Sequence, residues 1–187
     1  MNAETYMRDW IAKDKPANLE RPKHRHRFAT IASLLPLGLG LYEDVGCACG
    51  HSTEALRALV PGRWIGIDFS ESAIAAAVGS FPYCDWRLLT SLAELGRDDG
   101  PRPEGVVCSE VLEHVDDDAG LVAELVATTG HTLVLTTPCI PVDDPGHLRL
   151  YTREALEALF EPHGPAHIRR DKWFWYVTWR SRSGNKS

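Results

Sequence analysis

The sequence predicts a three-layer α/β/α fold built on a doubly wound, mostly parallel sheet. Five apolar, strand-like segments alternate with helix-like segments between residues 41 and 161. Such alternation is typical of parallel strands joined by crossover helices. Two further strand-like segments follow with only a short turn between them, which predicts an antiparallel hairpin at the C-terminal end of the sheet.

An N-terminal helical extension, residues 1–40, is expected to precede the core. A short helix is predicted over residues 2–14, before Pro16 and Pro22 interrupt the chain. A second helix is predicted over residues 23–35, because apolar residues recur there at helical spacing. These apolar residues are Phe28, Ile31, Leu34 and Leu35.

The core is expected over residues 41–180. Its strands are predicted at residues 41–46, 63–68, 84–89, 104–109 and 131–137. Its helices are predicted at residues 52–60, 71–78, 116–128 and 152–161. The hairpin strands are predicted at residues 167–170 and 173–180, and residues 181–187 are expected to form a flexible tail. Because no repeat or linker divides the chain, residues 1–187 are expected to form a single domain.

Composition narrows the class of protein. The 187 residues are 44% hydrophobic and 25% charged, as in ordinary globular domains. A net charge of −6 argues against broad, nonspecific binding of nucleic acid. No apolar run approaches the roughly 20 residues that span a bilayer, and the first residues lack the apolar core of a secretory signal. Five cysteines, an odd number, do not suggest a disulfide framework, so we expect a cytoplasmic protein without membrane contact.

The segment LYEDVGCACGHSTEAL, from Leu41 to Leu56, combines a predicted strand, a turn of small residues and a helix start. Small residues let a ligand approach the backbone closely, and a helix start offers free amides to polar groups. Asp68 ends the next predicted strand, at about the 20-residue spacing expected for an acid that binds a ribose. The pattern predicts the first half of a nucleotide-cofactor site.

Several segments resemble class I S-adenosylmethionine-dependent methyltransferases, in the order in which that family carries them. DVGCACGHST resembles the first motif, IGIDFSESAIAAA the second, CSEVLEHVDD the fourth, and LVLTTP the strand after it. GHLRLYTREALEALF resembles the loop and helix that close the site, so the matches run from about Tyr42 to Phe160. Ordered matches are more specific than one glycine-rich turn. The resemblance implies a Rossmann-like methyltransferase domain.

The resemblance also implies which residues bind S-adenosylmethionine. Asp44 would stabilise the turn or reach the cofactor's amino group, Asp68 would bind the ribose hydroxyls, and Phe69 would pack beside the adenine. The expected cofactor-binding residues are Asp44, Gly46, Cys47, Ala48, Gly50, Asp68, Phe69, Ser91 and Glu110. Ala48 departs from the family pattern, which has glycine there, and its methyl group is expected to crowd the cofactor or shift the turn. Alternatively, Asp68 caps the following helix, as Ser70 could equally do, and Ser91 is an ordinary surface serine.

Glu110, Glu113 and His114 form a second informative cluster. On a helical turn, positions i, i+3 and i+4 project to one side. In one interpretation, His114 is a general base for the acceptor and Glu110 orients it, because imidazole titrates near neutral pH. In another, Glu110, Glu113, His114 and His147 hold Mg²⁺ or Mn²⁺, which would lower the pKa of an acceptor hydroxyl. In a third interpretation, these residues simply form a structural turn.

The metal interpretation is supported by a further resemblance. The Glu-x-x-Glu-His run with a later histidine resembles the metal site of small-RNA 3′-terminal 2′-O-methyltransferases. Ubiquinone-pathway O-methyltransferases share the run. EVLEHV is also widespread in class I methyltransferases in which these residues simply shape the pocket.

Two more segments are candidates for contact with the acceptor. Residues 138–151, PCIPVDDPGHLRLY, are expected to form a lid whose His147, Arg149 and Tyr151 meet the substrate, although Tyr151 could pack and Arg149 could be solvated. The run RPKHRHR, residues 21–27, is the densest positive segment. It could steer an anionic acceptor such as RNA or a carboxylate, but a solvated helix start is the favoured interpretation.

These features predict an S-adenosylmethionine-dependent methyltransferase that methylates an oxygen or nitrogen of a small-molecule acceptor. A metal-dependent RNA 2′-O-methyltransferase is the first alternative. A protein that binds S-adenosylmethionine without catalysis is the second, and the alanine at position 48 motivates it.

Overall fold

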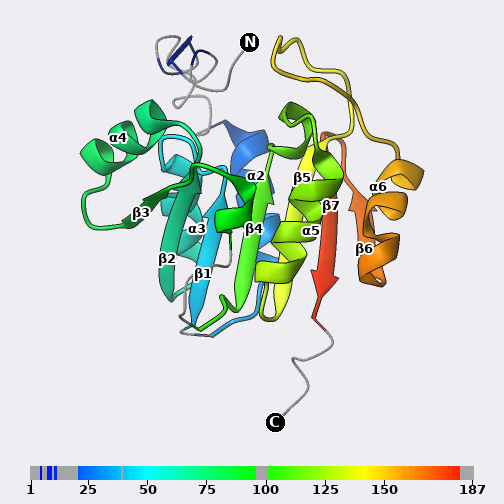
Figure 1. Cartoon of the computed structure of the whole chain (residues 1–187), viewed down its shortest axis with the longest axis horizontal. Helices are drawn as coiled ribbons and strands as arrows, with labels where there is room; N and C mark the ends of the chain where they lie inside the picture. Colours follow the sequence, from blue (N-terminus) through cyan, green and yellow to red (C-terminus); the bar gives the residue numbers. More distant parts are fainter. Residues whose placement is uncertain are drawn as a thin grey trace.

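Seven strands form one sheet in the part of the chain that the computed structural model describes, which is residues 5, 8, 9, 11, 21–38, 40–95 and 101–181 (Figure 1). Their spatial order is β3-β2-β1-β4-β5-β7-β6. The strands are β1 (Leu41–Val45), β2 (Arg63–Asp68), β3 (Asp85–Leu88), β4 (Gly105–Ser109), β5 (Thr132–Pro138), β6 (Ala166–Arg170) and β7 (Phe174–Arg180).

Helices connect these strands. The α-helices are α2 (Pro22–Leu34), α3 (His51–Leu59), α4 (Glu71–Ser80), α5 (Asp118–Thr128) and α6 (Arg153–Phe160). Short 3-10 turns are η2 (Leu92–Glu94), η3 (Leu112–His114) and η4 (Glu161–His163). Every predicted core element is present, with bounds within two residues of those expected. None of these helices is long and apolar enough to cross a membrane, a search that covered the described residues alone.

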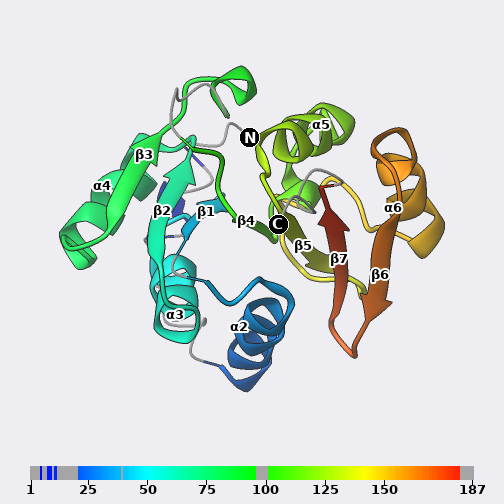
Figure 2. The same cartoon turned by 90° about the horizontal axis from the view of Figure 1, so that it is seen from below.

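The sheet separates two layers of helices, which confirms the predicted three-layer architecture. Figure 2 shows α2 and α3 on one face and α5 and α6 on the other. Each face has its own core: Phe28, Tyr42 and Leu56 belong to the first, and Leu121 and Phe160 to the second. Side chains alternate between the two cores along β7, because Tyr176 lies in the first core and Val177 in the second.

The direction of pairing decides where the loops gather. β3, β2, β1, β4 and β5 pair in parallel, and β7 runs antiparallel to β5. The carboxyl ends of the parallel strands therefore meet at one edge, the upper edge in Figure 1. Because Phe174 pairs with Pro138, the turn of the hairpin lies at this edge as well.

The turn after β1 has a constrained backbone. Gly46 and Gly50 have φ of 81° and 82°, a region that favours glycine. A Cβ atom on Gly46 would lie 2.2 Å from Cγ2 of Val111, and one on Gly50 would lie 2.4 Å from the Trp86 ring. Ala48 also has a positive φ, 48°, so the residue that replaces the expected glycine keeps a left-handed backbone. Packing as well as conformation therefore restricts the turn to small residues.

The ends of the chain are only partly described. Of the helix expected over residues 2–14, Thr5, Arg8, Asp9 and Ile11 are described and are helical, and the remaining positions lie outside the described residues. The tail expected from residue 181 onward lies outside them too, except for Ser181.

Replacing Gly46 with alanine should destabilise the fold by about 1–3 kcal/mol, because the new methyl group strains the backbone and meets Val111. Gly79→Ala, at the end of α4, is the control, because a Cβ there meets nothing within 4 Å. It should be neutral or stabilising by up to about 1 kcal/mol. Urea unfolding of both variants measures the difference, and equal stabilities would contradict the packing argument.

Candidate cofactor and acceptor site

Asp44, at the end of β1, ties the strand to the helix that follows. Its side chain is buried, and its Oδ2 accepts hydrogen bonds from Ser52 Oγ at 2.8 Å and Thr53 Oγ1 at 2.7 Å. Burial raises the pKa of Asp44, and the two hydroxyls oppose that rise. These contacts agree with the expected role of Asp44 in stabilising the turn. Its contact with the cofactor's amino group stays a prediction.

Asp68 closes the turn from the neighbouring strand. Its Oδ2 accepts the amide of Ala48 at 2.8 Å, and its Oδ1 accepts the amide of Ser70 at 2.9 Å. Ser70 itself caps α4 by accepting the amide of Ala73 at 3.2 Å. Ser70 is therefore the cap of α4, and both carboxylate oxygens of Asp68 accept backbone amides.

Several amides of the turn that precedes α3 are bonded within the protein. Those of Gly46 and Cys47 both donate to the carbonyl of Ile67, and that of Gly50 donates to the carbonyl of Cys47. The physical reason is that β2 extends alongside the turn and accepts these bonds. At the start of α3, Gly50 provides no side-chain cap, so donors for a ligand would come from the first turn of α3.

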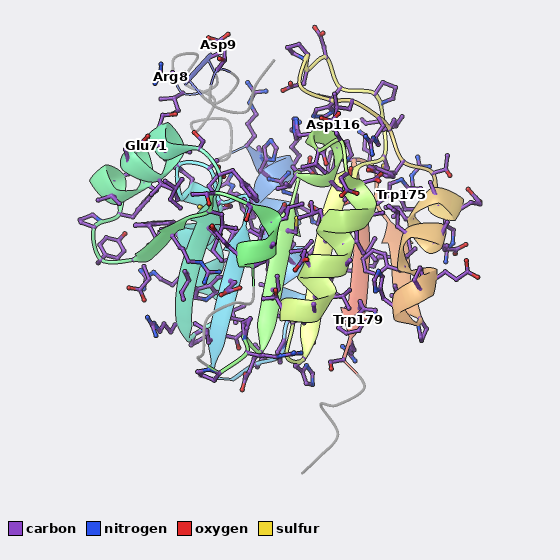
Figure 3. All side chains as sticks on the ribbon, in the orientation of Figure 1. Arg8, Asp9, Glu71, Asp116, Trp175 and Trp179 are labelled. Atoms are coloured by element: carbon purple, nitrogen blue, oxygen red, sulfur yellow. The ribbon has the colours of Figure 1, made fainter. Side chains whose placement is uncertain are left out.

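A cavity of about 390 Å³ lies beside the end of β2 and the end of β3. Phe69 and Thr90 line it, together with Arg8 from the N-terminal segment and Glu71 from α4. Figure 3 shows Arg8 and Glu71 on the same side of the molecule. Ser91 is exposed and is absent from the lining, where its neighbour Thr90 appears instead. The lining residues of this cavity are Arg8, Phe69, Glu71, Leu88, Leu89 and Thr90.

Glu110 does not join Glu113 and His114 on one helical face, so that part of the prediction was wrong. Glu110 has a left-handed backbone with φ of 61°, because its amide continues the sheet by bonding Thr136 at 2.9 Å. The turn η3 begins only at Leu112. The carboxylate of Glu110 instead accepts Thr136 Oγ1 at 3.2 Å and pairs with Arg27 Nη1 of α2 at 3.2 Å.

Arg27 was expected on a solvated helix start but is buried. Its side chain is 4% exposed, and its guanidinium lies 5.1 Å from the ring centre of Phe28 and 4.9 Å from that of Phe174. Burial raises the pKa of Glu110, and Arg27 opposes the rise. The sequence signal that could have revealed Arg27 is its place beside Phe28, on the apolar side of α2.

Glu113, His114 and His147 come together around one point. Their candidate ligand atoms all lie within 4.8 Å of one another. Glu113 is fully buried; its Oε2 accepts Thr137 Oγ1 at 3.0 Å, whereas its Oε1 makes no hydrogen bond and lies 4.0 Å from His147 Nε2. The rings of His114 and His147 meet edge to face, with centroids 4.7 Å apart. Of the four residues expected to hold a metal, Glu110 alone lies outside this group.

The electrostatics of the cluster favour neutral imidazoles. Burial raises the pKa of Glu113 well above its ordinary value, and the charge of Glu110 adds to the rise. Burial lowers the pKa of His114, with His147 as the second cause, and burial also lowers the pKa of His147. Because His114 Nδ1 is 3.0 Å from the carbonyl of Gly146, Nδ1 donates and Nε2 carries the lone pair in the neutral ring.

The other two predicted substrate residues of the lid, Tyr151 and Arg149, hold the loop in place. Tyr151 is buried, and its hydroxyl donates to Asp118 Oδ2 at 2.7 Å. Arg149 pairs with the same carboxylate and donates to the carbonyl of Asp116 at 3.1 Å. His147 is therefore the one of the three predicted substrate residues that reaches the cluster.

Comparisons with known proteins agree with this geometry. Residues 43–129 match the family model described as a methyltransferase domain, the segment that holds the turn, Asp68 and the Glu110–His114 run. A search of curated proteins finds no match. The three solved structures described next are 14–19% identical to this chain, so they bear on the fold alone.

Three of these structures illustrate the fold. The N-methyltransferase NodS from Bradyrhizobium japonicum WM9, with S-adenosylhomocysteine, is 19% identical with a TM-score of 0.74, over 98% of this chain and 100% of that one. A methyltransferase from Archaeoglobus fulgidus is 15% identical with a TM-score of 0.68, over 84% and 92%. The magnesium protoporphyrin IX methyltransferase of Synechocystis PCC 6803, also with S-adenosylhomocysteine, is 14% identical with a TM-score of 0.62, over 83% and 82%.

Breaking the ion pair between Arg27 of α2 and Glu110, the residue after β4, should destabilise the protein. Arg27→Met is expected to cost about 3 kcal/mol, because it leaves the charge of Glu110 without its partner. Adding Glu110→Gln to that variant should restore part of the loss. Arg63→Met is the control, because Arg63 and Asp85 form a pair that is largely exposed. Urea unfolding measures the wild type, Arg27→Met, Glu110→Gln, the double variant and Arg63→Met, and additive losses in the double variant would contradict the coupling.

Proposed function

We propose that this chain, whose residues 43–129 form a methyltransferase domain with the class I fold, transfers a methyl group from S-adenosylmethionine to an oxygen or nitrogen of a small molecule. One observation carries the proposal. The turn after β1, its partner Asp68 and the cluster of Glu113, His114 and His147 all lie at the carboxyl ends of neighbouring parallel strands. Open α/β sheets bind their ligands at this edge.

The residues present fit the cofactor. The carboxylate of Asp68, at the end of β2, would accept the ribose hydroxyls, Phe69 lines a cavity beside it, and α3 begins without a side-chain cap on its first amides. When bound, S-adenosylmethionine would supply an electrophilic methyl group on a sulfonium ion. Ala48 has a left-handed backbone and its amide donates to Asp68, which supports this fit.

The chain's own contribution to the reaction would be alignment and proton removal. Alignment of two reactants and exclusion of water account for most of what an enzyme adds to a direct displacement. His114, held through Nδ1 by the loop carbonyl of Gly146, would accept the acceptor's proton at Nε2. Glu110 would sit beside the reacting groups, with its carboxylate fixed by Arg27 and Thr136.

Asp68→Asn should weaken binding of S-adenosylhomocysteine about tenfold or more, because a charge-assisted hydrogen bond to the ribose is lost. Asp85→Asn, at the exposed start of β3, should leave binding unchanged. Calorimetric titration measures both variants. Binding that is unaffected in Asp68→Asn would remove Asp68 from the site, and no binding by the folded wild-type protein would sink the methyltransferase proposal.

His114→Gln should lower kcat by roughly 100-fold or more while binding of S-adenosylhomocysteine is kept, because general bases contribute about that much. The measurement is formation of S-adenosylhomocysteine with a panel of hydroxyl and amine acceptors. His163→Gln, in η4, is the control. Cofactor binding by wild-type protein without turnover of any acceptor would favour the non-catalytic alternative.

A second candidate is metal-assisted O-methylation, including 2′-O-methylation of RNA. The observation that favours it is Glu113 Oε1, a buried acceptor without a hydrogen bond that faces His147. A carboxylate oxygen and two imidazole nitrogens suit Mn²⁺ or Mg²⁺. A bound ion would polarise an acceptor hydroxyl and lower its pKa.

Manganese binding provides the test. Mn²⁺ followed by electron paramagnetic resonance should bind wild-type protein and His163→Gln, and bind Glu113→Gln and His147→Gln at least tenfold more weakly if the cluster is the site. Equal binding by all four proteins, or none, would eliminate the metal candidate and leave the general-base mechanism.

A further inference from the structure

The start of α2 brings positive charge to the candidate site. α2 begins at the same edge as the carboxyl ends of the parallel strands, because Arg27 meets Glu110 after β4 and the ring of His24 lies 6.2 Å from that of Phe174. Lys23 and His24 are half-buried there. We call Lys23, His24 and Arg27 the α2 basic cluster. It is concentrated on a chain whose net charge is −6.

Buried donors in this cluster lack hydrogen-bond partners. The contact from Arg27 Nη1 to Glu110 is an ion pair at 3.2 Å without the alignment of a hydrogen bond, and Arg27 Nε also makes none. His24 Nδ1 is buried and has no partner either. Buried polar groups are nearly always paired in folded proteins, because an unmade hydrogen bond is costly. These atoms are therefore available to an acceptor from outside the protein.

Charged groups of both signs surround the cluster. Burial lowers the pKa of His24 to about 3, and the next causes are the charges of Arg27, Lys23 and Arg21. Among the carboxylates, Glu110 pairs with Arg27, and Asp171 lies 3.3 Å from His26. Asp44 and Glu113 also interact with the charge of Arg27, but burial raises the pKa of both and so opposes their ionised forms.

We propose that the acceptor of this methyltransferase carries an anionic group, a carboxylate or a phosphate, that binds the α2 basic cluster beside Glu110. Lys23 supplies a half-exposed ammonium, His24 supplies an N–H from a neutral ring, and Arg27 supplies a fixed charge that its surrounding rings shield from water. The inference rests on the proposed function, because it assigns a substrate class to that same site. The anion fixes one end of the acceptor and leaves its nucleophile to face His114.

Simple probes test the anionic preference. Benzoate, phenyl phosphate and the neutral isostere benzamide would be titrated into the full-length protein, with and without saturating S-adenosylhomocysteine, and followed by ligand-observed NMR. At least one anion should bind about tenfold or more tightly than benzamide, because charge-assisted hydrogen bonds distinguish them. The tighter of the two anions identifies carboxylate or phosphate as the natural group.

Matched variants localise the binding. Lys23→Gln removes a charge, and His24→Phe removes Nδ1 while keeping a ring against Phe174. Each should weaken the preferred anion about tenfold. Arg180→Gln, at the far end of β7, should bind the anion as the wild type does. The imidazole resonances of His24 should report a higher pKa when the anion is bound, since a nearby negative charge stabilises the protonated ring.

Three outcomes would overturn the proposal. If benzamide binds as tightly as the anions, the protein has no anionic preference. If Lys23→Gln and His24→Phe leave anion binding unchanged, the anion binds at a different place. If a decauridylate displaces the anion and binds with much higher affinity, the acceptor is nucleic acid and not a small molecule. Failure of S-adenosylhomocysteine to bind counts against the proposed function alone, because the anion titrations are also performed without it.

Discussion

Parallel pairing of β2, β1, β4 and β5 is the constraint on which the rest of the molecule depends. It forces each connection to cross a face of the sheet as a helix or turn, and it returns every strand to the same edge. Residues far apart in sequence meet there for that reason. The amide nitrogen of Ala48 lies 2.8 Å from Oδ2 of Asp68, although 20 positions separate the two residues. The antiparallel β7 extends this edge by placing Phe174 beside Pro138.

Each carboxylate at the edge is held by a donor from a different element. Asp44 is held by hydroxyls of α3, Asp68 by the amide of the turn, Glu110 by Arg27 of α2, and Glu113 by Thr137 of β5. Buried carboxylates are tolerated only where such partners exist. The candidate site therefore also connects the strands to their helices, and its polar groups contribute to the stability of the fold.

The sequence predicted the elements well because hydrophobic periodicity is local. Every core strand and helix could be placed from apolar spacing, and the family motifs located the turn and Asp68. The contacts of individual side chains depend on tertiary packing, which the spacing of residues in the sequence does not reveal. Glu110 was expected to share a face with Glu113 and His114, but its backbone continues the sheet and its carboxylate turns to Arg27. Arg149 was expected to contact the substrate, and its side chain forms an ion pair with Asp118, which lies 31 positions earlier in the chain.

The loop between β5 and α6 is fastened at several points. The amide of Cys139 donates to the carbonyl of Trp173 at 2.9 Å, that of Leu148 donates to the carbonyl of Glu113 at 2.8 Å, and Tyr151 anchors the far end on Asp118. The stretch from residue 140 to residue 143 is thus the span that can move without breaking these bonds or the bond between His114 Nδ1 and the carbonyl of Gly146. Motions of so short a segment occur in nanoseconds to microseconds, far faster than typical turnover. Movement of this segment alone would then not limit how fast a ligand reaches this edge of the sheet.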